Sequence, residues 1–401
     1  MDIKESSQMS LFGTKSFDLT PPIVEVKKRL RAISKVESVN LQEIIDLEKS
    51  GKNRVGITRW LQAVSDKKIT IYQDLESFTP NGYDPGEVTS AMQKEIRRGH
   101  AITACWWARE LFRSPLFRGF GYCWKRLRIV TVEDIGYPGV VIAVGRLFNK
   151  FEEDHRIENL FEAVTIAANA KKKTRFFDEV NVYTYFIHDG RIKRDHPVLA
   201  EGVSDSPQAR LTELEKVIRL GKWFPSVWWA QKVMMSEGVK IKDDCWRMMR
   251  EIADSIDGKY SELVKILNEQ ACDNANAEKG LGVWDSVRCA LMSAFYLCMF
   301  FNGQKYDFDE TSDFDEEKIS KSFEEFERSK PIIPDYALDA HTIAGKKKGR
   351  GNMFWYLVSN KINNKVDLVE DKLMRVLLKA QLEGDKINLT VEEFERSLKS
   401  A

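Results

Sequence analysis

The chain has 401 residues, of which 43% are hydrophobic and 31% are charged, and its formal net charge is +1. This balance predicts a soluble protein with real cores and gives no bulk argument for nucleic acid. The longest apolar stretch, 290–301, is too short to span a membrane and is typical of a buried helix. The six cysteines form no C-x-x-C pair and the five histidines lack ligand spacing, so we expect reduced thiols in a cytoplasmic protein and no metal site.

Residues 1–20 are polar and carry neither helical periodicity nor the apolar stretch of a secretory signal, so we predict a disordered tail there. Residues 21–85 begin with two prolines and then have apolar residues at helical spacing, which predicts an N-terminal helical segment. The stretch TPNGYDPGE at 79–87 is dense in turn-forming residues and marks a boundary.

From residue 86 onward the sequence is helical in pattern, rich in tryptophan and internally repeated. The stretch 95–112 lines up with 217–234, and 123–128 lines up with 245–250. The stretch 160–167 lines up with 283–290 after a slippage of one residue. Blocks that recur in one order at nearly one spacing predict two related helical modules, at 86–205 and 206–310. We expect the paired tryptophans of the repeat in the core, namely Trp106, Trp107, Trp228 and Trp229.

The chain changes character after the second module. An acidic stretch covers 306–318, and we interpret residues 311–332 as a solvated acidic linker. Residues 333–401 combine a basic loop with C-terminal amphipathic helices. The predicted fold class is therefore mainly α, with duplicated helical modules behind a disordered N-terminal tail.

The sequence lacks the common catalytic signatures. It contains no phosphate-binding loop, no G-x-G-x-x-G, no H-E-x-x-H and no G-x-S-x-G. Glu133 and Asp134 could form a catalytic pair, although their place just before Gly136 is typical of a helix end. His341 beside Asp339 could serve as a base or contact a phosphate. We therefore predict no cofactor, and the sequence favours a protein without enzymatic activity.

Two basic segments are the candidate nucleic-acid contacts. Glycines let a backbone approach a phosphate, adjacent cations neutralise its charge, and the aromatic residues 354–356 could stack on bases. The alternative for the segment around 345–351 is a solvated loop followed by a core aromatic cluster, and the segment around 170–177 has the same alternative, which is favoured there. Arg97 and Arg98 add positive charge and are treated as ordinary surface residues. The candidate contacts are His341, Lys346, Lys347, Lys348 and Arg350 in one segment, and Lys171, Lys172, Lys173 and Arg175 in the other.

The N-terminal tail contains QMSLF at residues 8–12, which resembles the pentapeptide Q-L-[SD]-L-F by which bacterial replication proteins bind the sliding clamp. Met9 stands where that pentapeptide has leucine. The resemblance implies that Leu11 and Phe12 enter an apolar pocket of the clamp while Gln8 hydrogen-bonds at its rim. A flexible segment can bind in this way at modest affinity. The clamp-binding residues so implied are Gln8, Met9, Ser10, Leu11 and Phe12.

Residues 86–175 resemble the C-terminal collar and oligomerisation region of the RarA/MgsA family of clamp-loader-like AAA+ proteins. The motifs that carry the resemblance are SAMQKEIRRG, ACWWAREL and KRLRIVTVEDIG. It implies collar-like helical modules without catalytic residues. The ATPase module of that family and its Walker motifs have no counterpart in this sequence, so ATP hydrolysis is not implied. The segment LDAHTIAGKKKGRG also resembles one found in phage and bacterial relatives of this collar.

The leading hypothesis is a non-catalytic accessory protein of DNA replication or repair, bacterial or encoded by a phage. Its expected partners are the bacterial sliding clamp and DNA, with a second copy of the chain or a clamp loader as a further partner and no membrane. Such a protein would lie in the cytoplasm with the nucleoid. Two alternatives stay open. One is a nuclease-like DNA-processing enzyme, and the other is an inhibitor that occupies the clamp pocket without binding DNA.

Overall fold

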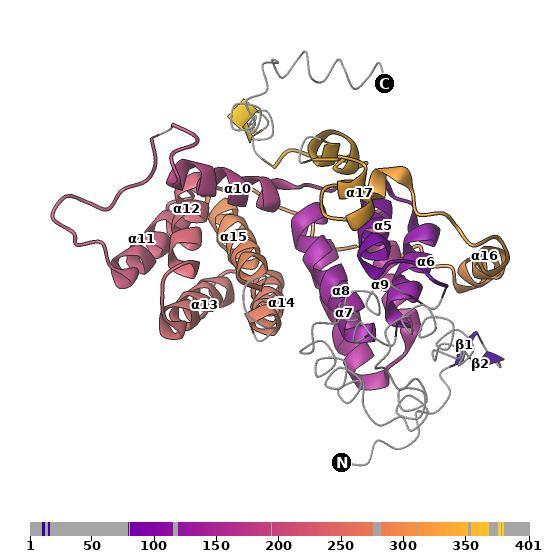
Figure 1. Ribbon diagram of the computed structural model, residues 1–401. Helices are drawn as coiled ribbons and strands as arrows, with labels where there is room; N and C mark the ends of the chain where they lie inside the picture. Colours follow the sequence, from indigo (N-terminus) through magenta and orange to yellow (C-terminus); the bar gives the residue numbers. More distant parts are fainter. Residues whose placement is uncertain are drawn as a thin grey trace, which may run out of the picture. The chain divides into compact units, whose positions relative to one another are not determined.

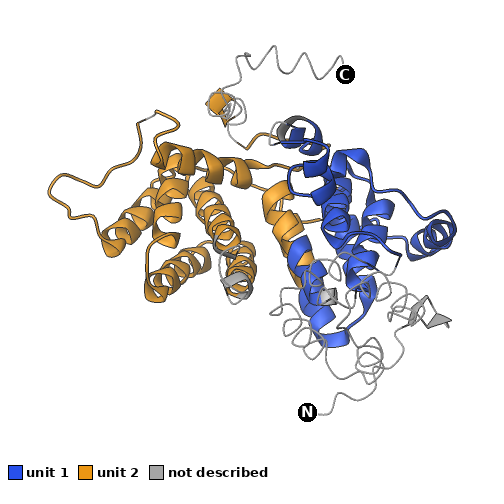
Figure 2. Cartoon of the chain, in the orientation of Figure 1, with its two compact units in different colours: residues 1–127, 147–169, 312–361 blue, residues 128–146, 170–311, 362–401 orange. Residues whose placement is uncertain are grey.

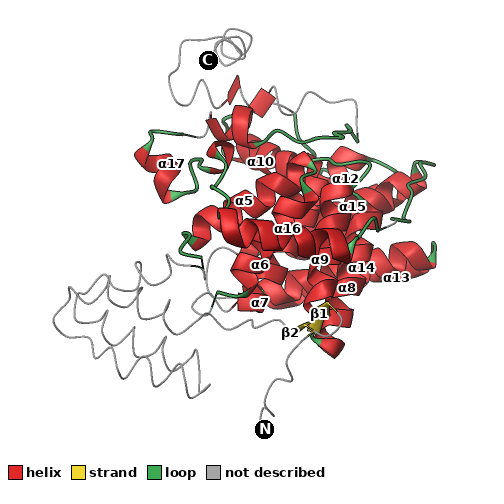
Figure 3. Ribbon diagram, turned by 90° about the vertical axis from the view of Figure 1, so that its right-hand side faces the viewer, coloured by secondary structure: helices red, strands yellow, loops and turns green. Residues whose placement is uncertain are grey.

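The computed structural model of the chain is mainly helical, as the sequence predicts (Figure 1). It describes residues 79, 81–114, 119–193, 195–275, 282–310, 312–351, 354–368, 376–377 and 379–380, together with the backbone of 10–12 and 15–16. Coloured by secondary structure in Figure 3, these residues are dominated by helices joined by loops, the longest of which connects α10 to α11. The part of the chain that the structure describes contains no helix of the length and apolarity needed to cross a membrane.

The chain divides into two compact units, drawn in blue and orange in Figure 2. The first unit comprises residues 1–127, 147–169 and 312–361, and the second comprises residues 128–146, 170–311 and 362–401. Each unit is therefore assembled from stretches that are far apart in the sequence.

The first unit is organised around α6 (Ala101–Phe112), which packs against α5 (Pro85–Arg98), α9 (Ile157–Asn169) and α16 (Glu316–Ser329). Asp84 caps α5 by accepting a hydrogen bond from the Glu87 amide at 3.0 Å, and a left-handed Gly99 ends the helix. Trp106 and Trp107 are buried, as predicted. The unit also contains most of α7 (Gly119–Val130), the end of α8 (Pro138–Asp154), and the short elements η2 (Asp335–Ala337), α17 (Ile343–Lys347) and η3 (Trp355–Ser359).

Helix α16 lies within the stretch that we interpreted as a solvated acidic linker. Its Ile319 and Phe323 are buried, and the ring of Phe323 meets that of Trp106 edge-on at 5.7 Å between centroids. Arg109 also pairs with Glu327 of this helix at 2.7 Å. Because aromatic residues bury large apolar areas, α16 belongs to the core of the first unit despite its acidic composition.

The second unit is organised around α15 (Gly282–Phe301), which covers the apolar stretch 290–301 and is buried over most of its length, as predicted. It packs against α11 (Pro207–Arg219), α12 (Trp223–Met234), α13 (Val239–Asp254) and α14 (Gly258–Ala275). Helix α10 (Phe176–His188) packs on α12, α15 and the π-helical turn η1 (Thr131–Ile135). Trp228 and Trp229 of α12 are buried, as predicted.

The bounds and packing of two helices correspond between the aligned stretches of the sequence. Helices α6 and α12 begin and end at corresponding residues, Ala101 with Trp223 and Phe112 with Met234. Helix α6 packs on α5 and α9, and α12 packs in the same way on the corresponding helices α11 and α15. These are the correspondences that a duplication would produce, and the duplication itself stays a prediction.

Near the N-terminus the structure assigns backbone pairing to two short strands, β1 (Ser10–Phe12) and β2 (Lys15–Ser16), which are antiparallel. The predicted clamp-binding residues Gln8 and Met9 lie outside the described residues. Ser10, Leu11 and Phe12 are described in their backbone alone.

Candidate nucleic-acid interface and its buried charges

The basic loop of the first unit is built on a tight turn at Asp339. Thr342 Oγ1 donates a hydrogen bond to the Asp339 carbonyl at 3.0 Å and accepts one from the Gly345 amide at 3.0 Å, which caps α17. A Cβ atom at Gly345 would lie 2.0 Å from the Asp339 carbonyl oxygen. Only glycine fits at that approach. The spacing of aspartate, threonine and glycine in this segment is therefore a requirement of the turn.

The Asp339 side chain is fully buried and ties the loop to α5. Its Oδ2 lies 2.7 Å from Lys94 Nζ, and its Oδ1 accepts the backbone amide of His341 at 2.9 Å. Burial alone would raise the pKa of Asp339, but the hydrogen bonds from His341 and the charge of Lys94 outweigh it and hold the pKa well below its usual range. Burial also lowers the pKa of Lys94 to about 8. Asp339 is thus held as an ionised anchor.

Arg97 and Arg98 hold the far end of the same segment. Arg97 Nη1 donates to Asn360 Oδ1 at 2.8 Å, and Arg98 Nη2 donates to the Val358 carbonyl at 2.8 Å. The Arg98 guanidinium also lies 3.7 Å above the centroid of the Tyr336 ring. Both arginines therefore tie α5 to this segment through internal contacts, and they are not the ordinary surface residues that the sequence suggested. Their partners lie more than 230 residues away in the sequence, so no local pattern could have revealed these contacts.

The four cations of the loop differ in what they contact. Arg350 donates to the carbonyls of Asp335 at 2.7 Å and Leu338 at 2.9 Å, and Lys348 Nζ lies 2.8 Å from Asp335 Oδ1. The side chains of the exposed Lys346 and Lys347 make no hydrogen bond or ion pair with the described residues, although the charge of Lys347 acts on the Glu87 carboxylate of α5. The loop therefore presents two exposed positive charges on a turn that is fixed by the other residues.

The second basic segment, 171–175, is largely internal. Lys173 is buried, and its Nζ donates to Asn363 Oδ1 at 2.6 Å. Burial lowers the pKa of Lys173 to about 7. Arg175 is also buried and forms ion pairs with Asp134 and Asp178. Of the four predicted contacts in this segment, only Lys171 and Lys172 are exposed, and Lys172 Nζ donates to the Tyr137 hydroxyl at 3.1 Å.

An acidic segment of the same chain lies beside these two lysines. Phe308 is buried with its ring 4.8 Å from that of Tyr260, and Glu310 Cγ would lie 3.1 Å from a Cβ at Gly139. Burial raises the pKa of Glu310, while the charges of Lys171 and Lys172 oppose that rise. The protein's own carboxylates thus partly neutralise the exposed part of the second basic segment.

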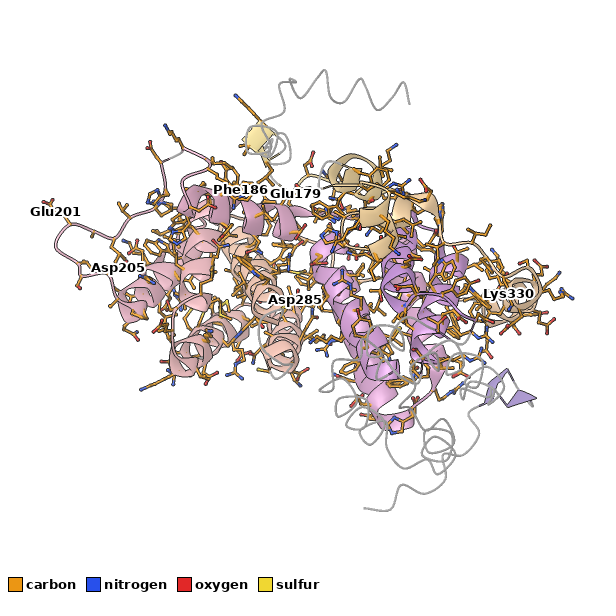
Figure 4. All side chains as sticks on the ribbon, viewed as in Figure 1. Glu179, Phe186, Glu201, Asp205, Asp285 and Lys330 are labelled. Carbon is orange, nitrogen blue, oxygen red and sulfur yellow. The ribbon has the colours of Figure 1, made fainter. Side chains whose placement is uncertain are left out.

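Glu133 and Asp134 belong to a buried charge network in the second unit. Arg288 of α15 lies 3.3 Å from Glu133 and 2.7 Å from Asp178, while Arg175 pairs with Asp134 and Asp178. Figure 4 labels two further acids of this region, Glu179 on α10 and Asp285 on α15. Gly136 ends η1 at a φ of 56°, as the helix-end interpretation expects. The two carboxylates are committed to arginines, an arrangement that fastens helices together.

The described residues offer no group of three or more histidine, cysteine or acidic side chains that could hold a metal ion. All six cysteines are free thiols, and five of them are buried. Burial raises the pKa of the Cys105 and Cys245 thiols to about 12, which disfavours their reactive thiolate forms.

In comparisons with known proteins, no protein-family model, no curated protein and no solved structure matches the chain.

Proposed function

We propose that the protein is a non-catalytic accessory factor of DNA replication or repair. In this proposal it binds a bacterial sliding clamp through residues 8–12 and contacts DNA through exposed lysines. The observation that carries the DNA contact is the pair Lys346 and Lys347, whose side chains are exposed and form no ion pair with the described residues, on a turn anchored by a buried ion pair. A preformed cationic turn loses little conformational freedom when it meets a phosphate, which favours binding.

Support for a non-catalytic role comes from the contacts of the three carboxylates that a nuclease-like enzyme could have used. Asp339 is buried against Lys94, Glu133 pairs with Arg288, and Asp134 pairs with Arg175. A metal-dependent nuclease needs carboxylates that converge on an open site. In the part of the chain that the structure describes, these carboxylates instead form internal ion pairs with lysine and arginine side chains.

The clamp contact rests on the sequence resemblance of residues 8–12. Tethering through such a tail would raise the local concentration of the folded body at the replication fork, so even a weak DNA contact would be occupied there. The clamp and the lysine turn would therefore act together, each compensating for the modest affinity of the other.

The test is binding of the full-length protein to a purified bacterial sliding clamp, measured by fluorescence anisotropy. We expect micromolar or tighter binding that is lost in the Leu11→Ala/Phe12→Ala variant. The matched control Phe17→Ala/Leu19→Ala removes two apolar side chains from the same tail outside the pentapeptide and should bind normally. Absence of wild-type binding would refute the clamp contact. Clamp binding without any DNA binding would instead favour the inhibitor that occupies the clamp pocket.

A further inference from the structure

An aromatic pair lies in the same segment of the chain as the two exposed lysines. The rings of His341 and Trp355 meet edge-on, with centroids 5.3 Å apart. The His341 side chain is 62% exposed, and Trp355 is half-buried. The His341 ring is oriented by its contact with Asp339 Oδ1 at 3.3 Å. Because Asp339 is itself buried against Lys94, the His341 ring of this pair is anchored to the interior of the first unit.

The two lysines share one face of the short helix α17 with Ile343. Residues three and four positions apart lie on the same side of a helix, so Ile343, Lys346 and Lys347 point the same way. Ile343 is 57% exposed, whereas Gly345 faces the Asp339 carbonyl. The exposed face thus offers two cations around an apolar centre, and it starts two residues after His341.

This combination separates two forms of nucleic acid. In a duplex the bases are paired and stacked on one another, so the lysines could reach phosphates but the rings would have no free base face to contact. In a single strand the bases are free to stack on aromatic side chains while the backbone meets the cations. The Arg350 guanidinium already stacks on Phe354 at 4.2 Å and is not part of this surface.

We propose that His341 and Trp355 form a base-stacking surface beside Lys346 and Lys347, and that this loop is selective for single-stranded nucleic acid. The inference rests on the proposed DNA contact and specifies its substrate. The lysines supply attraction that any polyanion would feel, and the two rings supply the discrimination between strand forms. Ile343 would pack against a sugar or a base edge between them.

The test compares a fluorescent oligo-dT of about 20 nucleotides with a duplex of the same length, at several salt concentrations, using the full chain. For the single strand, we expect His341→Ala and Trp355→Leu each to weaken binding about 5- to 150-fold, the loss typical of one stacked base. The slope of log K against log salt should stay unchanged. Lys346→Gln/Lys347→Gln should instead reduce that slope by about 1.4.

Two matched variants keep the result interpretable. His341→Phe retains a ring and should keep the single-strand affinity. Lys318→Gln/Lys321→Gln removes two exposed lysines from α16 of the same unit and should change neither affinity nor slope. Because His341 is mostly exposed, its variants should fold normally, so they decide the matter even if Trp355→Leu does not fold.

Equal wild-type affinity for both strand forms, unchanged in His341→Ala, would overturn the inference while leaving the DNA contact standing. Absence of binding to either form by the wild type would overturn the proposed DNA contact itself. Single-strand preference that is lost in His341→Ala and kept in His341→Phe is the result we expect.

Discussion

The buried ion pair between Lys94 and Asp339 makes a strong prediction about stability. The two side chains are 3% and 0% exposed, and the charged atoms lie 2.7 Å apart. Replacing Lys94 with methionine would leave a buried carboxylate without its cation, while Asp339→Asn would leave a buried ammonium without its anion. Breaking a buried pair from one side typically costs about 3 to 5 kcal/mol of unfolding free energy.

The expected size follows from Coulomb's law. At an effective dielectric constant of about 20, unit charges at this distance attract by about 6 kcal/mol, from which the loss of hydration must be subtracted. The double variant Lys94→Met/Asp339→Asn removes both charges together, so it should be much less destabilised than the sum of the single variants. We expect an interaction energy of about 3 kcal/mol in a double-mutant cycle measured by urea unfolding.

A matched control lies at the corresponding position of the second unit. Lys216 on α11 is 58% exposed and pairs with Glu213 at 3.0 Å, so Lys216→Met should cost no more than about 1 kcal/mol. The reasoning would be refuted if Lys94→Met cost as little as Lys216→Met, or if the effects of Lys94→Met and Asp339→Asn were simply additive.

Three further predictions concern the loop, the acidic segment and the second buried lysine. Gly345→Ala should displace the loop and lower both the melting temperature and DNA affinity, whereas Gly349→Ala, with a φ of +70° but open space, should cost only about 1 to 2 kcal/mol. Asp307→Asn/Glu310→Gln should raise DNA affinity about two- to fivefold in low-salt anisotropy by releasing Lys171 and Lys172, while Asp309→Asn, whose partner is Lys259, should not. Burial lowers the pKa of Lys173 to about 7, whereas the ordinary pKa of lysine is about 10. Between these two pH values Lys173 is protonated in the unfolded chain and neutral in the folded chain, so the unfolded chain binds more protons. Stability in urea should therefore rise from about pH 7 to about pH 10, and Lys173→Met should reduce that rise; an unchanged pH profile would contradict the burial.

Helical periodicity was enough to predict the fold class and the buried tryptophans, because both depend on local spacing. The same signal was available for α16, where Ile319, Phe323 and Phe326 recur at helical spacing, but the acidic composition of the stretch concealed it. The segment 171–175 shows what local reasoning misses. Lys173 and Arg175 stand in a run of cations that is typical of a surface. They are buried because Asn363, Asp134 and Asp178 meet them in the folded chain.

The first unit is assembled from stretches that are far apart in the sequence, and this has a consequence for synthesis on the ribosome. Trp106 lies in α6, but its aromatic partners Phe323 and Phe326 are translated more than 200 residues later. At about 5 to 20 residues per second, α6 must wait on the order of ten seconds or more before α16 emerges to cover it. During that interval the nascent chain would expose indole surface. The tryptophan-rich face of α6 is therefore the surface that we expect to need protection from aggregation during translation.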